Sequence, residues 1–364
     1  MKKWVFLAIL LSLLHVNIFA QTDVNTPALS GGANTVGISG QWFLAYQSKY
    51  IDNQPVDNQF TLKRGYVTFK KDFNKTFSVR YTQDITLDKE GSDAGNVEMR
   101  LKYLYLKVNL NSFSVFHNTY LEIGMIHTPW LDFEQHINDY RVQSPMFLEA
   151  SRLMNSADFG VNMVTLFGGR IDESYRENVS SSYPGKYGSF SVGVFNGGGY
   201  HAIEQNNNKT IAARLSLRPF PSSLPGLQFS LHGIYGKGNS ELNPDFNLAH
   251  AFVSYESERA IITAQAFRAL GNSYGTLLDI KNEPVKNQGV SAFGELYLIK
   301  RRLSLVGSYS FYEDIDEKED FNRKILGGLC LHFLNNQKLL LDIEHLNSDT
   351  GNQTMYELAL EIRF

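Results

Sequence analysis

The chain has 364 residues, a formal net charge of -3 at pH 7 and a mean hydropathy of -0.24. This slight acidity argues against a general nucleic-acid binder, whose surface is basic. A single cysteine, Cys330, excludes an intramolecular disulfide, and 25 phenylalanines, 19 tyrosines and 29 glycines are typical of strands that are apolar on one face only.

The first residues have the layout of a cleavable signal peptide. Lys2 and Lys3 precede an apolar run, which ends in Ile18-Phe19-Ala20 before Gln21. We therefore expect residues 1–20 to be a signal peptide, residues 21–35 a short periplasmic segment and residues 36–364 the folded domain. No later run approaches the roughly 18 apolar residues that a helical membrane span needs.

Segments with period-two alternation then recur to the end of the chain, separated by clusters of Asn, Asp, Gly and Pro. We expect about sixteen strands between residues 36 and 364, an even number that fits a bacterial membrane barrel. The alternation is least clear at 161–170 and 246–270. It is clearest at 76–82, 120–126, 210–218, 227–235, 303–311 and 338–346.

The connections between these segments alternate between short and long, as in a transmembrane β-barrel with turns on one rim and loops on the other. Residues 170–185 break this rule, so either a strand is miscounted there or the turn rim carries an insertion. The short connections are 72–75, 256–259, 299–302 and 334–337, and the long ones are 88–96, 197–208, 271–287 and 313–320.

The last nine residues, YELALEIRF, place Tyr356 and Phe364 on a wholly apolar face and acidic residues on the other. Lipid requires such an apolar face, and a water-filled lumen accepts the polar one. A strand that ends on Phe364 also resembles the signal read by the machinery that assembles outer-membrane barrels. The alternative is a soluble β-sandwich, which explains neither the loop pattern nor the lack of disulfides.

The longest segment without strand alternation runs from residue 130 to about residue 158. A connection of this length is usually functional or disordered, and its aromatic residues favour order. We predict that this third extracellular loop folds into the lumen as an eyelet, the alternative being a loop packed outside the barrel. The predicted eyelet residues are Trp130, Asp132, Glu134, Asp139, Tyr140, Arg141, Glu149 and Arg152.

The inner wall is predicted by assigning the more apolar parity of each strand to lipid. Basic side chains on the other parity would attract anions in a narrow pore. They are Arg64, Arg80, Lys107, His127, Arg214, Arg218, Arg302 and Lys324. The same rule places competing acids on the wall, namely Asp84, Glu295, Asp342, Glu344, Glu357 and Glu361.

Two stretches resemble motifs of a known family. GMIHTPW (124–130) is similar to a motif of glycine, glutamine, aromatic, lysine, any residue, proline and aromatic. Residues 192–220 are similar to a strand, an FNG loop, an asparagine-rich connection and a basic strand ending in Pro-Phe. With looser matches at 63–73 and 101–108, they resemble the phosphate-selective porins O and P, in the form common in Bacteroidota-like bacteria.

The resemblance implies a trimeric barrel of about sixteen strands that passes small anions. His127 stands where the motif has lysine, Tyr103 stands where an acid is expected, and the predicted eyelet is net acidic. These departures argue against strict phosphate selectivity.

The sequence thus predicts an all-β transmembrane antiparallel β-barrel in the outer membrane of a Gram-negative bacterium. As a porin it would pass small hydrophilic solutes, anions in particular, by passive diffusion. Its expected partners are outer-membrane lipid, these solutes, the barrel-assembly machinery and further copies in a homotrimer, with no nucleic acid, cofactor or metal. Motifs such as G-x-S-x-G and H-E-x-x-H are absent from the sequence, so no enzyme activity is predicted. The alternatives are a barrel scaffold for surface binding or adhesion and an outer-membrane enzyme.

Overall fold

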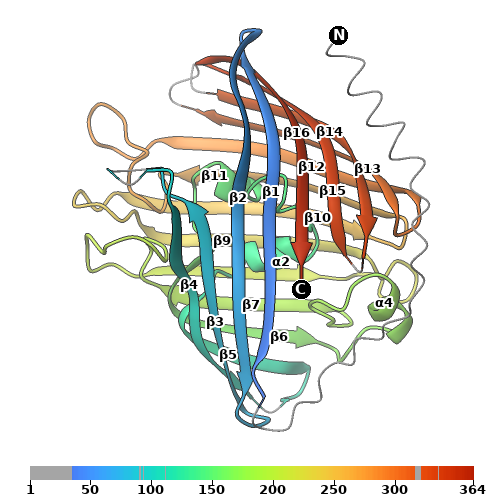
Figure 1. The fold of residues 1–364 in the computed structure, drawn as a ribbon. Helices are drawn as coiled ribbons and strands as arrows, with labels where there is room; N and C mark the ends of the chain where they lie inside the picture. Colours follow the sequence, from blue (N-terminus) through green and yellow to red (C-terminus); the bar gives the residue numbers. More distant parts are fainter. Residues whose placement is uncertain (1–34, 90–91, 93, 111, 316–320, 335) are drawn as a thin grey trace. The chain divides into compact units, whose positions relative to one another are not determined.

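The computed structural model describes residues 35–89, 92, 94–110, 112–315, 321–334 and 336–364. The predicted signal peptide and residues 21–34 lie outside these ranges, so their roles stay predictions. Within the described ranges, sixteen antiparallel strands form a closed ring in which each strand pairs with the next in sequence (Figure 1). The strands are β1 (Gly37–Ile51), β2 (Gln54–Asp72), β3 (Phe77–Leu87), β4 (Val97–Asn109), β5 (Phe116–His127), β6 (Ala157–Phe167), β7 (Gly188–Phe195), β8 (Thr210–Leu217), β9 (Leu227–Lys237), β10 (Asp245–Glu256), β11 (Ala260–Leu270), β12 (Lys286–Ile299), β13 (Leu303–Asp314), β14 (Phe321–Phe333), β15 (Gln337–Ser348) and β16 (Gly351–Arg363).

The ring closes where the first strand meets the last. Gln41 of β1 is paired with Arg363 of β16, and the register continues along both strands. Gly40 and Phe364 extend this ladder with two backbone hydrogen bonds of 2.9 and 3.1 Å. Closure leaves no sheet edge with unpaired amides, which is the condition for strands to cross a hydrocarbon layer. The predicted strand number and the all-β class are confirmed.

The two faces of the strands differ as the alternation predicts. In β9 the side chains of Gln228, Ser230 and His232 are buried, whereas Phe229 and Leu231 are 50% and 63% exposed. In β16 the acids of the polar face are likewise buried. Large apolar side chains on the outside and polar ones on the inside are the arrangement of a barrel surrounded by lipid.

The connection between β6 and β7 settles the ambiguity at residues 170–185. It is an insertion that carries the short helix α4 (Glu173–Asn178), and the strand count is unaffected. Two further helices, α2 (Leu131–Gln135) and α3 (Phe147–Ala150), belong to the connection between β5 and β6. In the described part of the chain, no helix has the length and apolar character needed to cross a membrane.

Candidate functional site: the inner face of the barrel

Charged side chains line the inner face and keep contact with water. Arg64 of β2 lies 2.8 Å from Asp84 of β3, and its side chain is 22% exposed. Lys324 of β14 lies 3.2 Å from Glu344 of β15 and is 23% exposed. A ring of this size holds an aqueous interior, in contrast to the packed interior of a small barrel.

The acids predicted for the inner wall all face inward, with exposed fractions between 0 and 9%. They are Asp84, Glu295, Asp342, Glu344, Glu357 and Glu361. The parity rule therefore placed these acids correctly.

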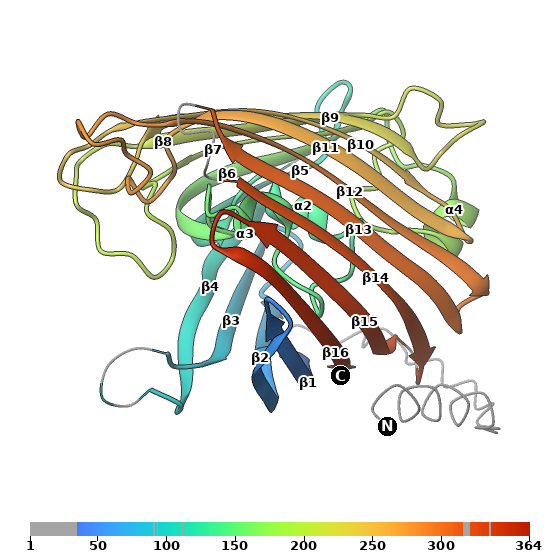
Figure 2. The same ribbon diagram turned by 90° about the horizontal axis from the view of Figure 1, so that it is seen from above.

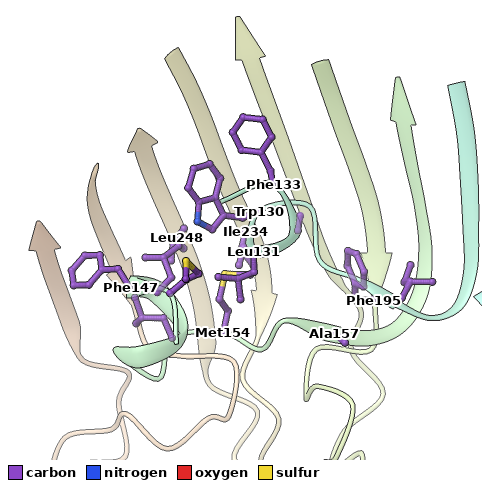
Figure 3. Close-up of a cluster of buried hydrophobic side chains, with 14 of the residues drawn as sticks. Trp130, Leu131, Phe133, Phe147, Met154, Ala157, Phe195, Ile234 and Leu248 are labelled. Atoms are coloured by element: carbon purple, nitrogen blue, oxygen red, sulfur yellow. The ribbon is translucent and has the colours of Figure 1, made fainter. Parts of the chain in front are cut away.

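The connection between β5 and β6, residues 128–156, carries the helices α2 and α3, which can be followed in Figure 2. Its buried side chains pack against those of β8 to β11. The ring of the fully buried Trp130 lies 4.3 Å from that of His250 on β10, and its indole N–H donates to Glu134 at 2.9 Å. Glu134 also accepts from Gln265 of β11 at 2.6 Å. Figure 3 shows Leu131, Phe133, Phe147 and Met154 of the same connection in this cluster. Leu148 and Leu153 also belong to it.

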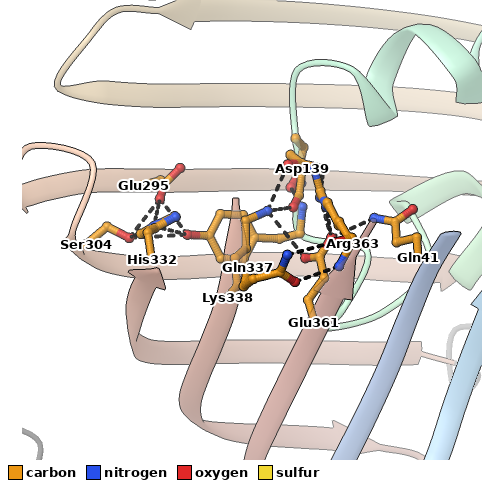
Figure 4. Close-up of polar contacts among 11 residues, drawn as sticks. Gln41, Asp139, Glu295, Ser304, His332, Gln337, Lys338, Glu361 and Arg363 are labelled. Atoms are coloured by element: carbon orange, nitrogen blue, oxygen red, sulfur yellow. Dashed lines mark hydrogen bonds and ion pairs between the residues drawn. The ribbon is translucent and has the colours of Figure 1, made fainter. Parts of the chain in front are cut away.

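A second set of contacts fastens the middle of this connection (Figure 4). Asp139 accepts from Lys338 of β15 at 2.9 Å and from Arg363 of β16 at 2.5 Å. The hydroxyl of Tyr140 donates to Glu295 of β12 at 2.5 Å. β12, β15 and β16 are not neighbours of β5 or β6 in the strand order, so the connection contacts two separate stretches of the ring.

Burial sets the ionisation of the two acids in α2. It raises the pKa of Glu134 to about 7, although hydrogen bonds from Gln265 and Trp130 oppose the shift. Burial would also raise the pKa of Asp132, but the imidazoles of His127 and His136 and the hydroxyl of Tyr183 hold it well below its ordinary value. Asp132 is therefore ionised at neutral pH.

Arg141 and Glu149 form an ion pair within the connection, at 2.6 Å. Burial opposes the ionisation of Glu149, yet Arg141 keeps the pKa of this carboxyl below its usual range. Arg152 differs from the other predicted eyelet residues, because its side chain is exposed. Its backbone makes two hydrogen bonds, in which the N–H donates to the carbonyl of Glu149 at 3.0 Å and the carbonyl accepts from Asn272 at 3.2 Å.

Arg214 and Arg218 face inward as predicted, but both are covered. Arg214 is 0% exposed and donates to the carbonyl of Pro129 at 3.0 Å, with its guanidinium 4.1 Å from the ring centroid of Phe133. Arg218, 2% exposed, follows the end of β8 and donates to the carbonyl of Gly185 at 2.6 Å. Since a solute cannot reach them, these arginines hold the connections in place, and their predicted contact with anions is wrong.

Three other predicted residues, on β3, β4 and β5, have the parity of the inner face. Nη1 of Arg80 lies 2.9 Å from Nε2 of His127. The Lys107 ammonium lies 3.6 Å from the ring centroid of Tyr120. Arg302, by contrast, lies in the exposed turn after the end of β12, so its prediction as an inner-wall residue is wrong.

The parity rule missed Lys102, which is 3% exposed and lies with its ammonium 4.7 Å from the ring centroid of Tyr66. A register shift between β3 and β4 at Thr82 and Gln83 turns both Lys102 and Tyr103 inward. A bulge of this kind inserts one residue and reverses the parity after it, with no signal in the local sequence.

Tyr356 lies on the outer face of β16, opposite to its buried acids, and Phe364 directly follows the end of this strand. The Tyr356 ring meets Tyr50 edge to face at 5.9 Å, and the Phe364 ring meets Trp42 at 6.3 Å. Their predicted role as an assembly signal stays a prediction. The described ranges contain no group of three or more His, Cys, Asp or Glu side chains placed to hold a metal ion.

No protein-family model matches the chain, and no curated protein matches it in sequence. Solved structures match its fold. OmpF of Salmonella typhi has a TM-score of 0.60 at 11% identity, over 91% of this chain and 98% of that one. The anion-selective porin of Comamonas acidovorans has a TM-score of 0.59 at 9% identity, over 91% and 99%. OmpT of Vibrio cholerae, in a trimer form, has a TM-score of 0.55 at 13% identity, over 90% and 99%.

At these sequence identities the structural similarity shows the fold alone. The side chains on the outer face indicate the environment of the barrel. The ring has the architecture of outer-membrane porins, and apolar side chains cover its outer face. A closed ring of this kind with a lipid-facing apolar exterior is an outer-membrane β-barrel of a Gram-negative bacterium.

Proposed function

We propose that the protein is a diffusion channel for small hydrophilic solutes, narrowed by the connection of residues 128–156. The observation that carries this proposal is the partly exposed ion pairs on the inner face, such as Arg64 with Asp84. Charges that keep contact with water inside a ring of this size favour a hydrated path. The contacts of Asp139 and Tyr140 with the far strands support a crossing segment that limits the size of the path.

Planar bilayers test this proposal. Purified, folded protein should insert with stepwise increases in current, whereas heat-denatured protein from the same preparation should give none. A folded barrel that inserts and carries no current would overturn the proposal and favour the surface scaffold or the enzyme.

Anion preference is the finer part of the proposal. Arg80 and Lys107 are inward-facing basic residues outside the covered pair Arg214 and Arg218, and the anion-selective porin of Comamonas acidovorans shares the fold. In a salt gradient the reversal potential should have the anionic sign, and Arg80→Glu should move it toward the cationic sign. A cationic sign in the unmodified protein would mean that the acids of the inner wall decide selectivity.

The resemblance to the phosphate-selective porins O and P and the trimer form of a structural neighbour also support a homotrimer. Chemical cross-linking of detergent-solubilised protein should give a trimer band. The resemblance by itself supports no selectivity for phosphate, given His127 and the acidic connection.

A further inference from the structure

A second feature of the interior lies between the two long connections. A cavity of about 490 Å³ is bounded by the inner faces of β4, β5 and β6, by Asp132 and His136 of the β5–β6 connection, and by residues 182–184 of the β6–β7 connection. Cavities that bind small organic molecules have volumes of about 300 to 1,000 Å³. The volume is larger than a single inorganic ion requires.

The two connections are joined where they enclose this cavity. The hydroxyl of Tyr183 donates to Asp132 at 2.5 Å. The Tyr183 ring meets Phe133 edge to face at 5.1 Å and His136 at 5.8 Å. The insertion that breaks the loop pattern is therefore fixed to the segment that crosses the lumen, and the enclosure does not depend on either connection alone.

The charges in the cavity lining favour an anion. Lys107 and Arg170 line it, and within the described ranges no carboxylate lies at ion-pair distance from either side chain. Asp132, the acid in the lining, already accepts from Tyr183 and has His127 at 3.4 Å and His136 at 3.7 Å. The lining thus carries two cations and one acid, and Glu122, which faces Lys107 across the β4–β5 ladder, lies 3.3 Å from His127.

Neutral groups complete the lining. Ser112, Asn118 and Ser182 contribute hydroxyl and amide groups that can bond to the hydroxyls of a ligand. We propose that this cavity binds a small organic acid that carries hydroxyl groups, such as a sugar acid, with its carboxylate between Lys107 and Arg170. The proposal rests on the diffusion function, because a solute that passes the channel would meet the cavity where it borders the β4–β5 turn.

Calorimetric titration of folded protein in detergent tests this site, with gluconate as the probe and glucose as its neutral counterpart. Gluconate should bind and glucose should bind at least about tenfold more weakly, since a charge-assisted contact is worth about 1.5 to 3 kcal/mol. Lys107→Gln and Arg170→Gln should each weaken gluconate about tenfold, and Arg170→Lys should restore part of the loss. Arg302→Gln, which removes the same charge from an exposed turn, should change nothing.

Three results would overturn the inference. They are no gluconate binding by the unmodified protein, gluconate binding by the Lys107 and Arg170 variants as tight as that of the unmodified protein, and inorganic phosphate binding as tight as that of gluconate. A variant that has folded migrates differently on a gel before and after heating, and this difference is measured for each variant. Binding without bilayer current would overturn the diffusion function and leave the site intact. Current without binding would overturn only the site.

Discussion

At the scale of single residues, Glu134 accepts from Trp130 within the β5–β6 connection and from Gln265 of β11, and the second bond joins the connection to the wall. Burial raises its pKa from 4.5 to about 7, so the folded chain holds a proton there that the unfolded chain has released. Between these two values the folded state binds more protons, and stability therefore falls as the pH rises. Above about pH 7 the stability that protonated Glu134 contributes is fully lost.

The fall of stability with rising pH gives a prediction for Glu134→Gln. On heating, the unmodified protein should lose the fluorescence of buried Trp130 at a lower temperature at pH 8 than at pH 5. The Glu134→Gln variant, which has no charge to gain, should show a smaller difference between these two temperatures. Glu173→Gln, at an exposed position of α4 with a side chain 75% exposed, serves as the control. A variant with the same pH dependence as the unmodified protein would show that another group titrates.

At the scale of elements, the β5–β6 connection has two anchors of different chemistry. Near its start, the apolar cluster around Trp130 packs against β9 to β11, whereas near its middle Asp139 pairs with Lys338 and Arg363. Lys338 and Arg363 also pair with Glu361 of β16, so the loss of Asp139 leaves these two cations with an acid on the wall but removes both ion pairs that hold the connection.

Asp139→Asn should therefore loosen the middle of the connection while the Trp130 cluster stays packed. We expect a higher and noisier single-channel current, because the segment that narrows the path moves away from β15 and β16. Asp349→Asn, in the exposed turn between the same two strands, should leave the current unchanged. A quiet current of normal size from Asp139→Asn would contradict this account of the anchor.

At the scale of the whole molecule, the ring depends on the seam between β1 and β16. A Cβ atom on Gly40 would lie 2.2 Å from the ring of Phe364, so the absence of a side chain at residue 40 allows the ring to cover this end of the seam. The Phe364 ring also meets Trp42, and an aromatic pair of this kind contributes about 1 kcal/mol.

Phe364→Ala should lower the fraction of protein that folds into detergent or lipid, measured as the band that migrates differently before and after heating. The reason is the lost contact with Trp42 and the uncovered seam. Phe113→Ala, at a side chain 76% exposed in the connection after β4, is the matched control. Equal folded fractions for the two variants would remove the special role of Phe364.

The sequence by itself determined the ring and its two faces. Alternation such as that of β9 and β16 fixes which side chains meet lipid, because the period of two is a property of the strand backbone. The number of strands, the turn and loop pattern and the inward acids followed from that periodicity.

Only the tertiary structure decided what the inward residues meet. Arg214 has the parity of a lumen residue, yet Pro129, distant in sequence, covers it. The bulge that turns Lys102 inward and the bond between Tyr183 and Asp132 arise from pairing and packing across the ring. Parity is a local property of the backbone, whereas exposure inside a closed ring depends on segments far apart in the chain, and for that reason the sequence could not give it.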